Sequence, residues 1–207
     1  MGGATQPEPP GGLYSMNIRA TIPPLIVLLC SVSAPGHAHL PVVAQPVLEI
    51  SAATVSHAVY GTIEGPDDLY VVRLRFDHAF ALPVEILVPR RSRLAEHRPA
   101  FAMVGPGLPA PTAEQAAILP QAVAKGEGVF LDLNDIPDRP VIFESFSSRV
   151  FWSSTPVALA LPAGEFEIWI FSPSGSTGDF VLGFGVEEDF SNFSCGALLS
   201  DWSTYAY

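Results

Sequence analysis

The stretch EFEIWIF (Glu165–Phe171) decides the fold, and DFVLGFGV (Asp179–Val186) follows it after a turn rich in Ser and Gly. In both stretches every second residue is large and apolar, and many residues are β-branched or aromatic. A period of two over five to eight residues is typical of β-strands that are buried on one face. The two stretches and the turn between them therefore predict a β-hairpin.

The same alternation recurs along most of the chain. In YVVRLRF (Tyr70–Phe76) the apolar residues alternate with Arg73 and Arg75, which predicts that the arginines lie on the outer face. Further runs of this kind occupy residues 55–64, 82–88, 100–104, 128–133, 140–146, 149–153 and 156–162. Only Thr112–Ile118 has the composition of a helix. Some ten short strands without intervening helices predict an all-β fold, an antiparallel, jelly-roll-like sandwich of two sheets.

The N-terminal region has the three-part layout of a secretory signal peptide over residues 16–38. A short polar start is followed by an apolar run (residues 22–32), which is too short to span a bilayer, and then by small residues. Signal peptidase requires small residues one and three positions before the cut, which favours cleavage between Ala38 and His39. We therefore expect a secreted or periplasmic protein with no integral membrane segment after signal removal.

The predicted signal peptide divides the chain into segments. Residues 1–15, rich in Pro and Gly, are expected to be a disordered extension or to precede the true start at Met16. Residues 39–190 are expected to form the sandwich, and the pattern leaves the structure of the tail, residues 191–207, open. Cys30 leaves with the signal peptide and Cys195 is left alone, so no internal disulfide is predicted.

Charge and motif content limit the function. The net charge is −11 and Lys125 is the single lysine, so binding to nucleic acid through a basic surface is not expected. The sequence contains neither the Gly-x-Ser-x-Gly turn of serine hydrolases nor the His-Glu-x-x-His helix of zinc proteases. The sequence therefore favours a non-enzymatic binding or accessory module over an enzyme.

Two stretches, VYGTIEGPDDLYVVRLRF (Val59–Phe76) and LPAGEFEIWIFSPSGSTGDFVLGFG (Leu161–Gly185), together resemble the bacterial pre-peptidase C-terminal domain. The resemblance implies a secreted, jelly-roll-like sandwich that is non-catalytic and often aids adhesion or substrate binding, with calcium near the acidic turn in some members. This chain has Asp68-Leu69-Tyr70 where the family usually has Asp-x-Asp, so the second carboxylate of that turn is missing. The matching positions are Gly61, Asp67, Asp68, Leu161, Gly164, Phe166, Gly178 and Phe180.

Metal binding is the alternative function. After cleavage His39 would be the N-terminal residue, and its amine and imidazole could both bind one copper ion, for which nitrogen ligands are suitable. A second imidazole would have to come from His57, His78 or His97. Calcium could instead bind oxygens of the turn that contains Asp67 and Asp68, although this turn alone supplies fewer than the six to eight oxygens that calcium requires.

Aromatic residues on outer faces are the candidates for ligand binding. Trp169 is expected on the same outer face as Glu165 and Glu167, and Trp152 lies on another strand. Exposed aromatic rings there could stack on a glycan or on a protein surface, or the rings could instead pack against the second sheet or the tail. The two glutamates, roughly 7 Å apart along the strand, have the spacing of a carboxylate pair for sugar chemistry, or they are simply solvated.

Overall fold

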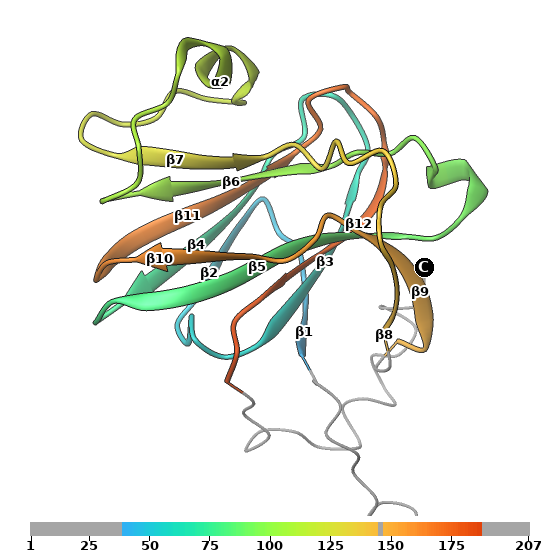
Figure 1. Ribbon diagram of the computed structural model, residues 1–207, viewed down its shortest axis with the longest axis horizontal. Coiled ribbons are helices and arrows are strands. Elements are labelled where there is room, and N and C mark those ends of the chain that lie inside the picture. The colour runs from blue at the N-terminus through green and yellow to red at the C-terminus, as the bar shows by residue number, and fades with distance from the viewer. Residues whose placement is uncertain (1–38, 145–146, 188–207) are drawn as a thin grey trace, which may run out of the picture. The chain divides into compact units, whose positions relative to one another are not determined.

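The computed structural model describes residues 39–144 and 147–187, which form twelve strands in two sheets (Figure 1). Sheet A has the order β1-β3-β12-β5-β9-β8, with β10 also paired to β5, and sheet B has the order β2-β4-β11-β6-β7. The strands of sheet A are β1 (Leu40–Val43), β3 (His57–Ile63), β5 (Phe80–Pro89), β8 (Val141–Glu144), β9 (Arg149–Ser153), β10 (Val157–Leu161) and β12 (Gly178–Phe184). Those of sheet B are β2 (Val47–Ile50), β4 (Tyr70–Phe76), β6 (Ala100–Gly105), β7 (Gly128–Asp132) and β11 (Gly164–Phe171). The prediction of an all-β fold of two packed sheets is confirmed.

The core lies between the two sheets and follows the alternation of the sequence. Side chains from the inner faces of both sheets make one cluster of buried residues. From sheet A they include Val59, Ile63, Leu82, Val84, Ile86, Leu159, Leu161, Phe180, Leu182 and Phe184, and from sheet B Val72, Leu74, Phe76, Phe101, Met103, Phe166, Ile168 and Ile170. Because successive side chains of a strand point to opposite faces, burial of this set sends Arg73, Arg75, Glu165 and Glu167 to the outer face of sheet B.

The prediction of a β-hairpin made by Glu165–Phe171 and Asp179–Val186 is wrong. β11 pairs with β4 and β6 in sheet B, whereas β12 pairs with β3 and β5 in sheet A. The turn between them therefore carries the chain from one sheet to the other, which the alternation within each strand does not reveal.

Two strand pairings also differ from the prediction of an antiparallel sandwich. β1 runs parallel to β3, and β2 runs parallel to β4. These two strands are only four residues long and three residues separate them, so the chain passes directly from one sheet to the other. Each then lies in the same direction as the strand it joins. Strands of four residues, separated by a connection that contains Pro46, are hard to recognise from periodicity alone.

A single short α-helix among the described residues, α2 (Ala113–Ile118), lies in the connection between β6 and β7. It starts with a capping box, in which the Thr112 hydroxyl accepts from the backbone of Gln115 while the Gln115 side chain accepts from the backbone of Thr112. No helix in the described ranges is long and apolar enough to cross a membrane. The predicted signal peptide, Cys195 and the tail lie outside the described residues.

One end of the sandwich contains a buried polar cluster around His97. The 3-10 helix η1 (Ser92–Leu94) and the residues after it pack against the turn between β11 and β12. His97 Nδ1 shares a 3.1 Å hydrogen bond with the Ser176 hydroxyl, and Arg93 Nη2 donates to Asp179 Oδ2 over 2.7 Å. Arg139 crosses to this end and donates to the carbonyl oxygen of His97 over 3.0 Å. These polar contacts hold the loops in place where the apolar core ends.

Candidate functional site

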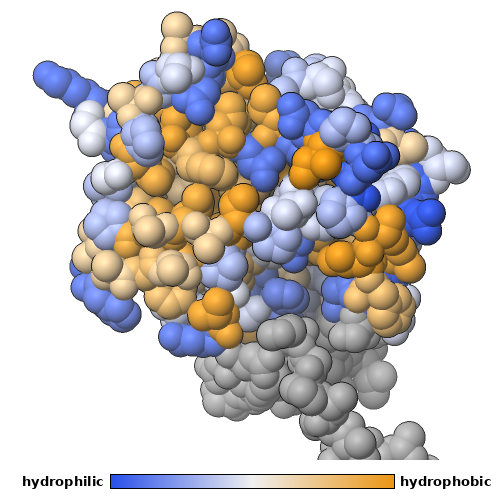
Figure 2. Space-filling view, in the orientation of Figure 1, coloured by the Kyte–Doolittle hydropathy of each residue, from blue (hydrophilic) through white to orange (hydrophobic). Residues whose placement is uncertain are grey.

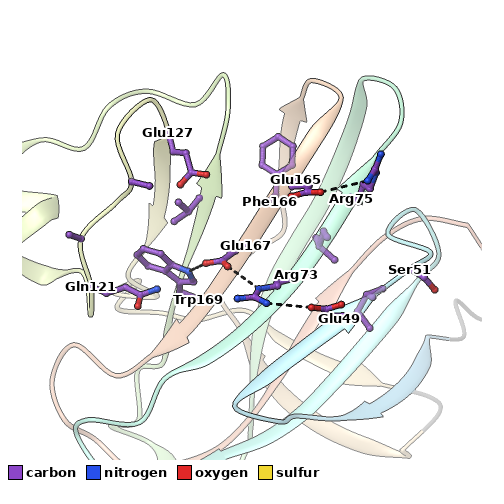
Figure 3. A pocket seen from close by; sticks show the side chains of 15 residues that line it. Glu49, Ser51, Arg73, Arg75, Gln121, Glu127, Glu165, Phe166, Glu167 and Trp169 are labelled. Atoms are coloured by element: carbon purple, nitrogen blue, oxygen red, sulfur yellow. Dashed lines mark hydrogen bonds and ion pairs between the residues drawn. The ribbon is translucent and has the colours of Figure 1, made fainter.

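A hollow of about 810 Å³ lies on the outer face of sheet B (Figure 3). Its floor comes from β2, β4, β11 and β6, and one wall comes from the connection that follows α2, residues 119–127. We call this hollow the trough. Its volume falls in the range of about 300–1,000 Å³ that small-ligand sites usually have. The trough is therefore the first place to look for a ligand in the described part of the chain.

A row of three charged side chains crosses the floor of the trough. Arg73 Nε donates to Glu167 Oε1 over 3.1 Å, and Arg73 Nη1 donates to Glu49 Oε1 over 3.4 Å. The strand register causes this contact, because Arg73 pairs directly with Glu167 on one side and with Glu49 on the other. The hydrogen bond to Glu167, followed by that to Glu49, raises the pKa of the Arg73 guanidinium.

A second, more exposed row lies beside the first. Arg75 pairs in register with Glu165, and Arg75 Nη1 lies 3.6 Å from Glu165 Oε1. Arg75 Nε also lies 3.5 Å from a carboxylate oxygen of Asp77. Each arginine of the floor therefore binds two carboxylates.

Trp169 lies on the outer face of β11, as the alternation predicts, but it is covered. Only 3% of its surface is exposed, since it packs in an apolar cluster with Leu119 and Val123 of the connection after α2. Its indole Nε1–H donates to Glu167 Oε2 over 2.8 Å. The expectation of an exposed tryptophan face is therefore wrong at this position. Trp169 instead lines the trough next to the wall and holds the Glu167 carboxylate by this hydrogen bond.

The wall of the trough carries polar groups that the fold does not use. Leu119 and Val123 anchor the connection on the sheet, and Gln121 and Glu127 are exposed beside the trough. Neither Gln121 nor Glu127 makes a side-chain hydrogen bond or ion pair within the described residues. In Figure 3 these two side chains lie opposite the two charged rows. No motif singles out Gln121 or Glu127, because nothing in the local sequence indicates that this connection folds back over sheet B.

Glu165 and Glu167, the candidate carboxylate pair, both bind arginine. Glu167 has both oxygens engaged, one with Arg73 and one with Trp169. A general acid must be held in its protonated form, which an adjacent arginine opposes. The arrangement is suited to holding a ligand by hydrogen bonds and gives no indication of acid–base chemistry.

Trp152, the other aromatic candidate, lies on the opposite sheet. It is half-buried on β9, and the Arg139 guanidinium stacks 4.7 Å from the centre of its ring. Trp152 pairs with Val141, and Phe143 pairs with Val150 two positions further along, so these four side chains share one face. Phe143 is 66% exposed, and Figure 2 shows hydrophobic residues gathered at the right of the view, over β8 and β9. Because Trp152 and Trp169 belong to different sheets, they do not form one binding surface.

The structure does not gather the residues proposed for copper. His39 Nδ1 shares a 2.6 Å hydrogen bond with the Ser56 hydroxyl. His57 lies one strand away, but its ring stacks on Phe184 and its Nδ1–H donates to the Val55 carbonyl oxygen over 2.7 Å; burial lowers its pKa. His78 lies in the turn after β4 and His97 lies beyond η1. Copper at His39 stays a prediction.

The acidic turn between β3 and β4 uses its carboxylate for the backbone. Asp68 Oδ2 accepts from the N–H groups of Glu64, over 2.6 Å, and Gly65, over 3.0 Å, while Asp67 is exposed. This is ordinary turn chemistry for aspartate. In the ranges that the structure describes, no three His, Cys, Asp or Glu side chains lie close enough to hold a metal ion. Calcium at this turn therefore also stays a prediction.

Comparison of the chain with models of known protein families and with curated proteins gave no match. The likeness to the pre-peptidase C-terminal domain thus rests on the motif residues alone. Of these, Gly61 and Phe180 form a register pair between β3 and β12.

Proposed function

We propose that this protein is an exported, non-enzymatic module that binds its ligand in the trough on sheet B. The observation that carries the proposal is the trough itself, in which a preformed hollow combines paired charges on its floor with unused polar groups on its wall. Binding sites are usually largely preformed, and their placed polar groups fix the orientation of the ligand. The likeness to a secreted accessory domain agrees with this function.

The floor of the trough is suited to recognition because it is rigid. It is built on β2, β4, β11 and β6, which are hydrogen-bonded neighbours in one sheet, and the core lies directly beneath them. Sites on strands hold their side chains more precisely than sites on loops. The cross-strand contacts of Arg73 with Glu49 and Glu167 further restrict these side chains. A ligand would therefore meet groups that are already positioned, which lowers the entropy cost of binding.

Removing the polar wall is expected to weaken binding without unfolding the protein. The double variant Gln121→Ala/Glu127→Ala changes two exposed side chains that make no side-chain hydrogen bond or ion pair with the described residues, so its melting temperature should stay near that of the wild type. Loss of two hydrogen bonds to a ligand corresponds to about a ten- to thirtyfold weaker affinity. A thermal-shift screen with neutral polysaccharides, acidic polysaccharides and basic peptides identifies the ligand. Calorimetry then measures the affinity of the wild type and of the double variant for that ligand.

The matched control is Gln45→Ala/Asp138→Ala, which removes one exposed amide and one exposed carboxylate outside the trough. Its affinity is expected to stay within twofold of the wild type. Equal affinity of the ligand for Gln121→Ala/Glu127→Ala and for the control would show that the trough is not the binding site.

Export is expected to leave His39 as the first residue. Mass spectrometry of protein recovered from the medium or periplasm of an exporting host should give the mass of residues 39–207. The same sample, offered copper and calcium in turn, is expected to retain neither metal. A recovered mass that still includes residues 16–38 would contradict the export proposal, and one retained copper would favour the metal-binding alternative.

A further inference from the structure

Resting on the proposed function, we propose that the ligand of the trough is a neutral glycan chain. The proposal comes from the charge balance of the lining, from the hydrogen-bonding groups that remain unused there and from the extent of the hollow over the sheet. Each of these observations excludes or favours a class of ligand.

The charge balance of the lining disfavours an anionic ligand. Four glutamates line the trough, Glu49, Glu127, Glu165 and Glu167, against the two arginines Arg73 and Arg75. Both arginines already contact two carboxylates each. A phosphate, sulfate or uronate group would therefore meet excess negative charge and would compete with the carboxylates that both arginines already contact.

A compact cation is not favoured either. The side chains of Glu49 and Glu165 are 76% and 82% exposed, so water screens their charge. Glu167 is more enclosed, but Arg73 and Trp169 occupy both of its oxygens. Within the described residues no three acidic or metal-binding side chains gather around one point. The carboxylates of the trough are thus placed to accept hydrogen bonds and are not arranged as a cation cage.

The unused groups match hydroxyls. Arg73 uses Nε and Nη1 for its ion pairs, and its Nη2 has no partner among the described residues. Gln121 offers a carbonyl oxygen and an amide N–H₂, and Glu127 offers two acceptor oxygens. A hydroxyl both donates and accepts, so adjacent hydroxyls of a sugar can bind to neighbouring donors and acceptors without adding charge.

The trough extends across several strands. Its lining runs from Glu49 on β2 over β4 and β11 to Val104 on β6, which is three strand spacings, or roughly 14 Å. Ile50, Val104 and Ala122 also line the trough, and of these Ala122 is exposed and can contact the carbon face of a sugar ring. These dimensions favour a short stretch of a chain over a single sugar.

The test uses the mature protein and soluble polymers of three charge classes: neutral polysaccharides (a glucan, a mannan, a xylan and a galactan), polygalacturonate and oligolysine. Binding is measured by calorimetry at 50 and 500 mM NaCl. At least one neutral polysaccharide should bind, with an affinity that changes less than twofold with salt. Ala124→Trp, which places a large side chain on the wall of the trough, should weaken this binding at least tenfold.

Ala117→Trp is the matched control, because Ala117 is exposed on α2 and does not line the trough. Neutral polysaccharides that do not bind, or that bind Ala124→Trp as well as the control, overturn the glycan assignment. Salt-sensitive binding of oligolysine or polygalacturonate that Ala124→Trp abolishes also overturns it, but leaves the trough as the binding site. If Ala124→Trp changes the binding of no polymer, the proposed function fails together with the glycan assignment.

Discussion

Between pH 6.5 and about 4, the free energy of unfolding is expected to fall by about 3 kcal/mol because of His97. Only 2% of His97 is exposed, and burial lowers its pKa from 6.5 to about 4. In this window the unfolded chain binds a proton at His97 that the folded chain does not bind. The contribution of the neutral His97 ring to the free energy of unfolding is therefore fully present above pH 6.5. It is lost as the pH falls and changes no further below about pH 4.

The surroundings of His97 agree with a neutral ring. Among residues 39–144 and 147–187 its Nε2 has no hydrogen-bond partner, so a second proton there would be buried without an acceptor from this part of the chain. Burial is the largest effect on the pKa of His97, and Arg139 also opposes protonation of the ring. Asp179 and the backbone contacts at Gly178 and Ser176 favour protonation, but less strongly than burial opposes it.

Urea titrations from pH 7 to pH 4 measure this effect by comparing wild type with His97→Phe, which keeps a ring but does not titrate. Burial raises the carboxyl pKa of Glu85 and of Asp132, so protonation of these two groups favours the folded state as the pH falls. This opposes the effect of His97. The effect of His97 is therefore read from the difference in pH dependence between wild type and His97→Phe. His78→Asn, at an exposed position, should retain the wild-type slope. An equal slope in His97→Phe and wild type would show that His97 is not responsible.

Phe180→Ala is expected to destabilise the protein by about 3–5 kcal/mol, the usual cost of emptying a large aromatic site. Phe180 is fully buried on β12, lies edge-on to Tyr70 with ring centres 5.5 Å apart, and covers Gly61 on β3. Phe143→Ala is the control, because Phe143 is 66% exposed and should change stability by less than about 0.5 kcal/mol. Chemical denaturation measures the free energy of unfolding of the wild type and of both variants.

The glycine opposite Phe180 gives a second readout of the same packing. A Cβ on Gly61 would lie 2.5 Å from the Phe180 ring, so Gly61→Ala is expected to cost about 1–3 kcal/mol. In the double variant the ring is absent and that clash disappears, although a contact with Ala44 at 2.8 Å remains. The loss of stability in the double variant should therefore be smaller than the sum of the losses in the two single variants, by at least about 1 kcal/mol. Simple additivity would show that the ring and the glycine do not pack as described.

Alternation along the longer strands, such as β4 and β11, was sufficient to predict a sandwich and the inner faces of these strands. Phe166, Ile168 and Ile170 lie in the core, and Glu165 and Glu167 lie on the outer face. This part of the fold is local information, because a strand has a period of two whatever its neighbour is. The capping box at Thr112 is likewise a local pattern, and the helix predicted there is present.

The candidate site depended on contacts that are distant in sequence. Arg73 meets Glu167 only through the register of β4 with β11, and Glu49 reaches the same arginine only because β2 joins the sheet in parallel. Trp169 is covered because the connection after α2 folds back and places Leu119 and Val123 over it. The sequence by itself determined which face of each strand is apolar. The tertiary structure decided which strands are neighbours, in what register, and which part of the outer face is hollow, since these depend on pairing between segments that carry no mark of their partners.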